Sequence, residues 1–147
     1  TRIREEAGAS LEVPLHMEHR VLSPSDFGFH NALKDESGRL WFFDFEYAGW
    51  DDPAKLLCDY FCQPQVPVSI EHAETFVESL RQTTGDESLS ARFKLLLPLH
   101  AAKWSCILLN EFLKNDAERR RFAGLQDRRE TQLEKARAML AKSVSFC

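Results

Sequence analysis

Apolar residues in the second half of the chain recur at helical spacing. From Leu89 onward they repeat every three or four positions, which predicts a helix in the middle of a core. The pattern is formed by Leu89, Phe93, Leu96, Leu97, Ala101, Trp104, Ile107, Leu108 and Phe112. Pro98 interrupts this run and is expected to kink the helix or divide it in two. A last helix is expected from about Asn115, with apolar positions from Phe122 to Leu140.

Two further helices are predicted by their end signals. Asp52 followed by Pro53 is an N-cap with proline at the first helical position, and it predicts a helix that continues to Cys62. Ser69 is expected to cap the next helix, which Gly85 ends.

A β-hairpin is predicted in the first half of the chain. Residues 31–33 and 40–45 have the composition of two strands, and the polar residues 34–39 between them include a glycine suited to a turn. Residues 20–22 are a candidate short strand. These elements predict an α+β fold that is mostly α, in which a small hairpin packs on a helical body. Residues 1–147 are expected to form a single domain.

Composition narrows the class of protein. The 147 residues suit one domain with a core, and 44% hydrophobic with 29% charged residues is typical of a soluble globular protein. The net charge of −4 gives no reason to expect nucleic acid as a partner. No apolar run approaches the ~20 residues that span a bilayer, and no signal peptide opens the sequence. We therefore expect a cytoplasmic protein without a membrane partner, in which Cys58 and Cys62 are reduced and buried rather than a metal pair.

The stretch from Ser23 to Asp59 carries oxygen ligands at a spacing that suits phosphoryl transfer. Asp26 lies five residues before Asn31, and Asp44 follows at hairpin distance. Transfer from ATP needs hard oxygen ligands for Mg²⁺ and a carboxylate that orients the acceptor hydroxyl and takes its proton. In type, order and spacing, Asp26 suits the base, and Asn31 and Asp44 suit the metal ligands.

The surroundings of these residues are apolar in sequence. Gly28 would permit unusual backbone geometry in the loop. Four phenylalanines are expected to anchor the loop and the strand in apolar surroundings: Phe27, Phe29, Phe43 and Phe45. Taken singly, Asp26 reads as a turn cap, Asn31 as a partner of backbone groups and Asp44 as an exposed strand residue. The combination favours chemistry, and an aspartate within Trp-Phe-Phe-Asp-Phe is expected to be buried, which is costly without a metal or partners.

These residues resemble the catalytic core of the aminoglycoside phosphotransferase and choline kinase group, which shares the protein-kinase-like fold. That group usually carries His-Gly-Asp-x-x-x-x-Asn, then Ile-Asp-Phe-Glu or Ile-Asp-Phe-Gly, then a Gly-Asp-Pro-like segment that opens a helix. The matching segments are Ser25-Asp26 with Asn31, Phe43-Asp44-Phe45-Glu46-Tyr47-Ala48-Gly49, and Asp51-Asp52-Pro53-Ala54. The match covers about a quarter of the chain.

The resemblance implies a function and roles for the residues. Asp26 would be the catalytic base, and Asn31 and Asp44 would bind Mg²⁺ and, through it, ATP. The γ-phosphate would pass to a hydroxyl of an aminoglycoside, choline or a similar small molecule. His30, beside Asn31, is a candidate contact for phosphate or acceptor. Glu46, Tyr47 and Trp50, next to the metal loop, are further candidates for the substrate pocket.

The sequence departs from the group's pattern at three points. Pro24 stands where the group usually has a histidine, and Leu56 stands where it often has an aspartate, with Asp59 one turn further on. No glycine-rich loop followed by a strand lysine covers the ATP phosphates. The chain is therefore expected to be a C-terminal lobe that is inactive alone and needs an N-terminal lobe in cis or in trans. The alternatives are a non-catalytic kinase-like binding or regulatory module and, less well supported, a helical interaction domain whose acidic loop binds a structural cation.

Overall fold

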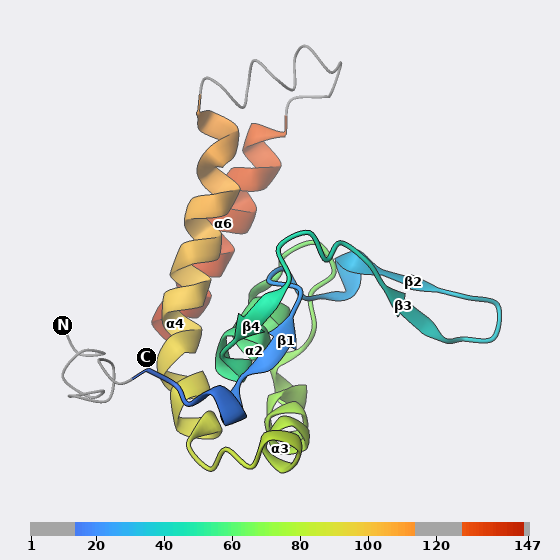
Figure 1. Ribbon diagram of the computed structural model, residues 1–147. Coiled ribbons are helices and arrows are strands. Elements are labelled where there is room, and N and C mark those ends of the chain that lie inside the picture. Colours follow the sequence, from blue (N-terminus) through green and yellow to red (C-terminus); the bar gives the residue numbers. More distant parts are fainter. Residues whose placement is uncertain (1–13, 114–127, 146–147) are drawn as a thin grey trace. The chain divides into compact units, whose positions relative to one another are not determined.

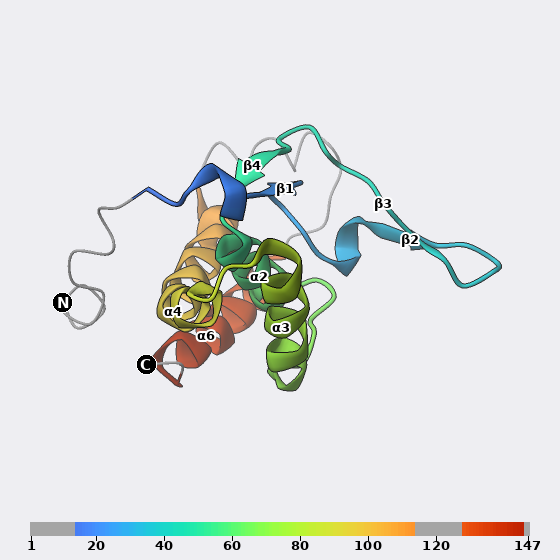
Figure 2. The same ribbon diagram turned by 60° about the horizontal axis from the view of Figure 1, so that its bottom comes forward.

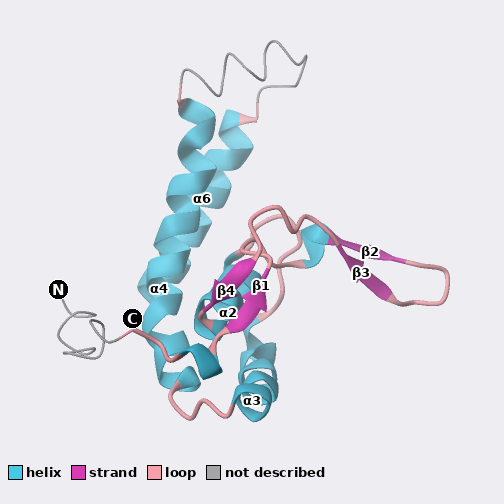
Figure 3. Cartoon of the chain, viewed as in Figure 1, coloured by secondary structure: helices cyan, strands magenta, loops and turns pink. Residues whose placement is uncertain are grey.

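The computed structural model describes residues 14–113 and 128–145 of the chain, which forms two compact units, Thr1–Leu96 and Leu97–Cys147. The protein is mostly helical with a small β part of two short sheets, as Figure 3 shows. This confirms the α+β, mostly α, class. The single domain over 1–147 stays a prediction. The expected start of the last helix near Asn115, with Phe122 and Leu125, lies outside the described residues.

The β part of the first unit consists of two antiparallel strand pairs. Strand β1 (Val21–Ser23) pairs with β4 (Gly49–Asp51), and β2 (Ala32–Lys34) pairs with β3 (Leu40–Phe42). Figure 1 shows β2 and β3 as a hairpin that extends away from the β1–β4 pair. The hairpin and the first strand are confirmed. The second hairpin strand ends at Phe42, short of the expected position 45, and β4 was not expected.

The Asp35 carboxylate organises the turn of the hairpin. Its Oδ1 accepts hydrogen bonds from the Ser37 hydroxyl at 2.6 Å and from the backbone amides of Ser37 and Arg39, each at 2.9 Å. Its Oδ2 accepts one from Trp41 Nε1 at 2.8 Å. Gly38 completes the turn with a φ of +86°, which glycine adopts readily. The Ser37 and Trp41 side chains and the Arg39 amide together lower the pKa of Asp35 to about 2.

Acid is therefore expected to loosen this turn. Because the folded-state pKa of Asp35 is depressed, its contribution is complete above the ordinary value of 3.8 and is lost as the pH falls through about 2. The Trp41 indole N–H and the Ser37 and Arg39 amide resonances should shift together over that range in NMR spectra. The Asp35→Asn variant should show no such joint transition. Resonances that stay constant down to pH ~2 would contradict the assignment.

Capping residues fix the helices of the first unit. Asp52 Oδ1 accepts from the Ala54 amide at 2.8 Å, which confirms the expected N-cap. Ser69 caps a short 3-10 turn that leads into α3, and Gly85 ends α3 with a φ of +66°. The helical segments of this unit are η2 (Met17–His19), η3 (Phe29–Asn31), α2 (Pro53–Cys62), η4 (Ile70–His72), α3 (Ala73–Thr84) and the start of α4 (Leu89–Leu108).

The core of the first unit lies around α2. Figure 2 shows α2 and α3 side by side, and aromatic rings join them, with Tyr60 and Phe76 centroids 5.1 Å apart. Cys58 and Cys62 are buried, as expected of apolar thiols. The other buried apolar residues are Ala54, Leu56, Leu57, Phe61, Ala73, Val77, Leu89 and Phe93. This core forms the support on which the loops of the β part lie.

The second unit is built from helices. It contains the remainder of α4, η5 (Leu109–Phe112) and α6 (Arg129–Ser145), with η5 packed against α6. Helix α4 continues through Pro98, so of the two expected outcomes the division into two helices is wrong, and the kink stays a prediction. The buried apolar residues described in the second unit are Leu97, Ala101, Leu108, Ala136 and Met139. None of the helices in the described ranges is both long and apolar enough to cross a membrane.

Candidate functional site

The two strand pairs bring two loops together. In the β1–β4 pair Ser23 lies opposite Gly49, and in the β2–β3 pair Ala32 lies opposite Phe42. The Phe43 amide also donates to the carbonyl oxygen of Asn31 at 3.0 Å. Residues 24–31 and 43–48 therefore both run from the β1–β4 ladder to the β2–β3 ladder (Figure 1). Asp26 and Asn31 lie in the first loop and Asp44 in the second.

Within the first loop, Asn31 is held against the backbone of Asp26. Its Nδ2 donates to the Asp26 carbonyl oxygen at 3.0 Å, and the asparagine is buried. With the amide nitrogen used in this way, Oδ1 is the side-chain atom of Asn31 with the chemistry of a cation ligand. The Asp26 carboxylate is about half exposed, at 51% of the side chain, so it is open to solvent.

The position of Asp44 differs from the one expected, which was a buried place on the strand. It follows β3 instead of lying on it, adopts a φ of +65° and is exposed. The argument that a buried carboxylate here requires a metal is therefore wrong, because water can solvate this one. A left-handed conformation is uncommon for residues other than glycine, and aspartate tolerates it better than most. Such conformations cluster at functional sites, where surrounding structure maintains them.

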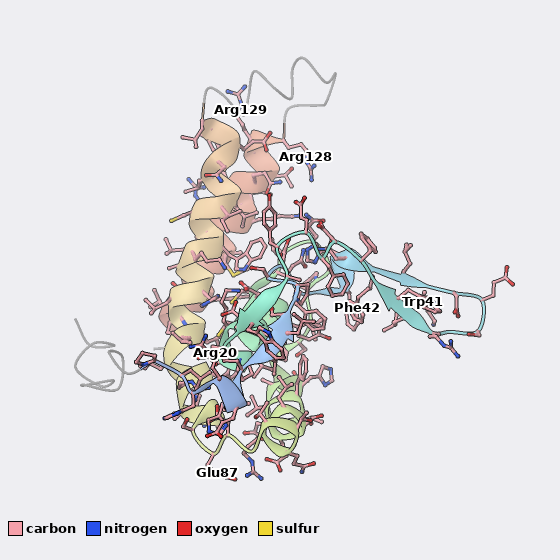
Figure 4. All side chains as sticks on the ribbon, viewed as in Figure 1. Arg20, Trp41, Phe42, Glu87, Arg128 and Arg129 are labelled. Atoms are coloured by element: carbon pink, nitrogen blue, oxygen red, sulfur yellow. The ribbon has the colours of Figure 1, made fainter. Side chains whose placement is uncertain are left out.

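Aromatic contacts anchor the first loop but not the second. The Phe27 ring lies 5.0 Å from Phe42 and 5.5 Å from Tyr60, and Phe29 lies 5.5 Å from Tyr60. Phe42 is labelled in Figure 4 on β3, beside Trp41, and successive residues of a strand point to opposite faces. The anchoring role expected of Phe27 and Phe29 is confirmed. The one expected of Phe43 and Phe45 is wrong, since both are exposed.

The His30 imidazole contacts the Asp26 carboxylate. Its Nε2 is 3.2 Å from Asp26 Oδ2, and its side chain is only 7% exposed. Its Nδ1 is buried and has no hydrogen-bond partner in the part of the chain that the structure describes. The ring thus contacts the candidate base directly rather than standing at an open surface.

A lysine that sequence reasoning missed links the loop to α2. Lys55 Nζ lies 2.6 Å from Asp51 Oδ2, 3.4 Å from Asp59 Oδ2 and 3.4 Å from the Ser25 hydroxyl. Partial burial opposes its charge, but the Asp51 hydrogen bond and the charge of Asp59 outweigh that and hold the pKa of Lys55 above its usual value. The sequence contained a signal for these ion pairs, because Lys55 lies four residues after Asp51 and four residues before Asp59. Leu56, where the group often has an aspartate, is a buried core residue.

The remaining candidate pocket residues border the second loop. Glu46 and Tyr47 lie within it, and Trp50 lies on β4 opposite Leu22 in the ladder. Apolar side chains of this β part are exposed in unusual number: Leu22, Leu33, Leu40, Trp41, Phe43, Phe45, Tyr47 and Trp50. Large exposed apolar groups that gather in one region mark surfaces that bind ligands or other protein.

Among the described residues, no three His, Cys, Asp or Glu side chains converge as a metal cage would require. A Mg²⁺ ion bound by one carboxylate, one amide and the phosphates of a nucleotide does not require such a cage. Asn31 and Asp44 carry donors of these two types, one in each loop.

No protein-family model, curated protein or solved structure matches the chain.

Proposed function

We propose that this chain is the C-terminal lobe of a kinase-like phosphotransferase, which transfers the γ-phosphate of ATP to a hydroxyl of a small molecule. The observation that carries the proposal is the pairing of β1 with β4 and of β2 with β3. Through it, the loop that holds Asp26 and Asn31 and the loop that holds Asp44 run between the same two ladders, and the Phe43 amide donates to the Asn31 carbonyl oxygen. A base, an amide ligand and a carboxylate ligand thereby come from two adjoining loops, as phosphoryl transfer requires.

Each residue has a role that its surroundings support. The half-exposed Asp26 carboxylate would accept the proton of the attacking hydroxyl. Asn31 Oδ1 and the exposed Asp44 carboxylate would be the protein ligands of Mg²⁺, which also takes phosphate and water oxygens. Bound in this way, the ion supplies charge neutralisation for the nucleotide phosphates.

The acceptor is proposed to be an amino sugar, an amino alcohol such as choline, or a similar cation. Glu46 offers a carboxylate, and the exposed rings of Tyr47 and Trp50 offer aromatic faces beside the second loop. Cations bind favourably to such faces, and quaternary ammonium groups are a common case. These three residues would therefore contribute to the acceptor pocket.

A second lobe, in cis or in trans, is part of this proposal. The chain itself carries no glycine-rich loop followed by a strand lysine to pair with the ATP phosphates. The exposed apolar side chains on the β part, Trp41 and Trp50 among them, are what a packed neighbouring lobe would cover. Residues 1–147 alone are accordingly expected to transfer no phosphate.

The experiment is to measure γ-phosphate transfer by the full-length protein that contains these residues. A panel of amino sugars and amino alcohols would be offered with Mg²⁺ and ATP. We expect transfer to at least one acceptor, its loss when the metal is removed with a chelator, and its recovery when Mg²⁺ is restored. Transfer that persists unchanged without a divalent cation would contradict the proposed metal site.

The exposed apolar surface also favours a second candidate, a non-catalytic kinase-like module that binds or regulates another protein. Such a module would need the same apolar contacts but no metal-phosphate chemistry. Mg²⁺-dependent turnover of ATP separates the two, because a binding module would show none with any acceptor.

A further inference from the structure

The imidazole of His30 is buried in contact with a candidate catalytic group. Its Nε2 lies 3.2 Å from Asp26 Oδ2, and 93% of its side chain is out of contact with solvent, since only 7% is exposed. The side chain of Asp26 itself is about half exposed. One carboxylate oxygen of Asp26 is thus held by protein, and the other is left for the acceptor.

Gly28 provides the space that this arrangement needs. A Cβ at position 28 would lie 2.8 Å from His30 Nδ1 and 3.1 Å from its Cε1, closer than carbon atoms normally approach ring atoms. The φ of Gly28 is 169°, an extended value that any residue adopts, so glycine is required here for its size and not for unusual backbone geometry. The loop therefore brings its own backbone close to the ring on the side away from Asp26.

Within residues 14–113 and 128–145, the other ring nitrogen has no competing hydrogen-bond partner. His30 Nδ1 is buried and unpaired among the residues that the structure describes. Because a neutral imidazole carries one N–H, placing the proton on Nε2 gives a donor directed at Asp26 Oδ2 and leaves Nδ1 as the bare nitrogen. The alternative tautomer would set two acceptors against each other at 3.2 Å.

From these contacts we propose that His30 is the positioning residue of Asp26. This inference rests on the proposed phosphotransferase function and deepens it. His30 Nε2–H donates to Asp26 Oδ2 and keeps its proton throughout. Asp26 Oδ1 then points to the acceptor hydroxyl, receives its proton as the oxygen attacks the γ-phosphorus, and the bond to the leaving ADP oxygen breaks. In this chain Pro24 stands two places before Asp26, so support for the carboxylate comes from His30, four places after it.

The contact is tested first without any reaction, by NMR of the protein labelled with ¹⁵N-histidine. A hydrogen-bonded, buried ring N–H should give a proton resonance that exchanges slowly with water and is absent from His30→Gln. We expect this resonance to persist in Asp26→Asn, whose amide oxygen still accepts, and to be lost in Asp26→Ala. A resonance that survives in Asp26→Ala would show that packing alone holds the ring, and would overturn the proposal.

Kinetics then test the positioning role in the full-length enzyme. His30→Leu should lower kcat about 10- to 100-fold with little change in KM, a loss comparable to that of other orienting partners. His30→Gln, which can donate to the same oxygen, should restore much of it. Gly28→Ala retains His30 but displaces its ring, so it should lower kcat and weaken the N–H resonance together. His72→Gln, at an exposed histidine, is the matched control and should behave as wild type.

The outcomes separate this inference from the proposed function. Wild-type kcat in His30→Leu, together with an inactive Asp26→Asn, would overturn the positioning role and leave the function standing. Turnover that is unaffected by Asp26→Asn would overturn the proposed function itself. The hydrogen bond between His30 and Asp26 could then still be confirmed by NMR, but it would have no role in catalysis.

Discussion

Asp44→Asn is expected to lower phosphoryl transfer by the full-length enzyme about a thousandfold. Asparagine retains the shape of aspartate and tolerates the left-handed backbone at φ +65°, so the variant removes the charge without straining the loop. The lost charge is the proposed anionic protein ligand of Mg²⁺. A metal ion contributes several kcal/mol to the stabilisation of a phosphoryl-transfer transition state, and each 1.36 kcal/mol is a factor of ten in rate.

Asp26→Asn tests the other half of the site and should have a different kinetic signature. Loss of a general base lowers kcat by about 10²- to 10⁴-fold. It should leave the Mg²⁺ concentration for half-maximal activity unchanged, whereas Asp44→Asn should raise that concentration. Measuring rates over a series of Mg²⁺ concentrations separates the two effects.

Glu36→Gln is the matched control for both variants. It removes one exposed carboxylate from the hairpin turn, within the same unit but outside the two loops. We expect wild-type rates from it. If Asp26→Asn and Asp44→Asn also retain wild-type rates, the proposed chemistry is wrong, and the apolar β part is better explained as a protein-binding surface.

Elements with local signals were predictable from the sequence. Asp52 and Pro53 begin a helix because the carboxylate accepts from an amide two residues ahead and proline suits the first helical position. The hairpin turn also depends on local residues, since Asp35 accepts hydrogen bonds from residues within the turn and Gly38 adopts its left-handed backbone conformation. In both cases the residues that determine the element lie inside it.

Elements that depend on distant partners were not predictable in the same way. β4 has only three residues, begins with glycine and forms because Trp50 lies opposite Leu22 in an antiparallel ladder. No alternation of apolar and polar residues is detectable over so short a segment. Yet this ladder holds the start of one loop beside the end of the other, since Ser23 lies opposite Gly49, so the geometry of the candidate site depends on it.

Burial was the other property that the sequence could not determine. The apolar neighbours of Asp44 suggested a core position, but Phe43 and Phe45 are exposed along with it. The His30 side chain, by contrast, is a polar group that is buried, and the backbone of Gly28 lies close against its ring. The case for the site consequently rests on which loops the ladders join, rather than on the cost of burying a carboxylate.

Arg92→Met is expected to reduce the free energy of unfolding by about 3 kcal/mol. Arg92, in the first turns of α4, donates to Asp52 through Nε at 3.0 Å and Nη2 at 2.9 Å, and to Asp86 through Nη2 at 2.6 Å. The Asp86 side chain is 3% exposed, so methionine would leave a buried carboxylate without its counter-charge. Breaking such a pair costs about 3–5 kcal/mol, and the 24% exposure of Asp52 favours the lower end.

Arg81→Met provides the comparison for this variant. Arg81 also bridges two carboxylates, Glu78 and Glu87, but both are solvent-exposed. Exposed ion pairs contribute little, because water and salt screen them. Urea unfolding of the two variants beside the wild type should therefore show a large loss for Arg92→Met and a much smaller one for Arg81→Met. Equal losses would contradict the importance of burial.

The pH dependence of the unfolding free energy tests whether Asp86 is the carboxylate through which Arg92 stabilises the fold. Burial raises the pKa of Asp86, but hydrogen bonds from Arg92 and Ser88 outweigh it and hold the pKa at about 2, below its ordinary 3.8. A depressed folded-state pKa contributes stability that is complete above pH ~4 and is lost as the pH falls to about 2, which amounts to about 2 kcal/mol. In Arg92→Met the loss of stability that comes from protonation of Asp86 should disappear, since the cation that depresses the pKa of Asp86 is gone. If wild type and variant lose stability in parallel over that range, Asp86 is not the group that couples Arg92 to the fold.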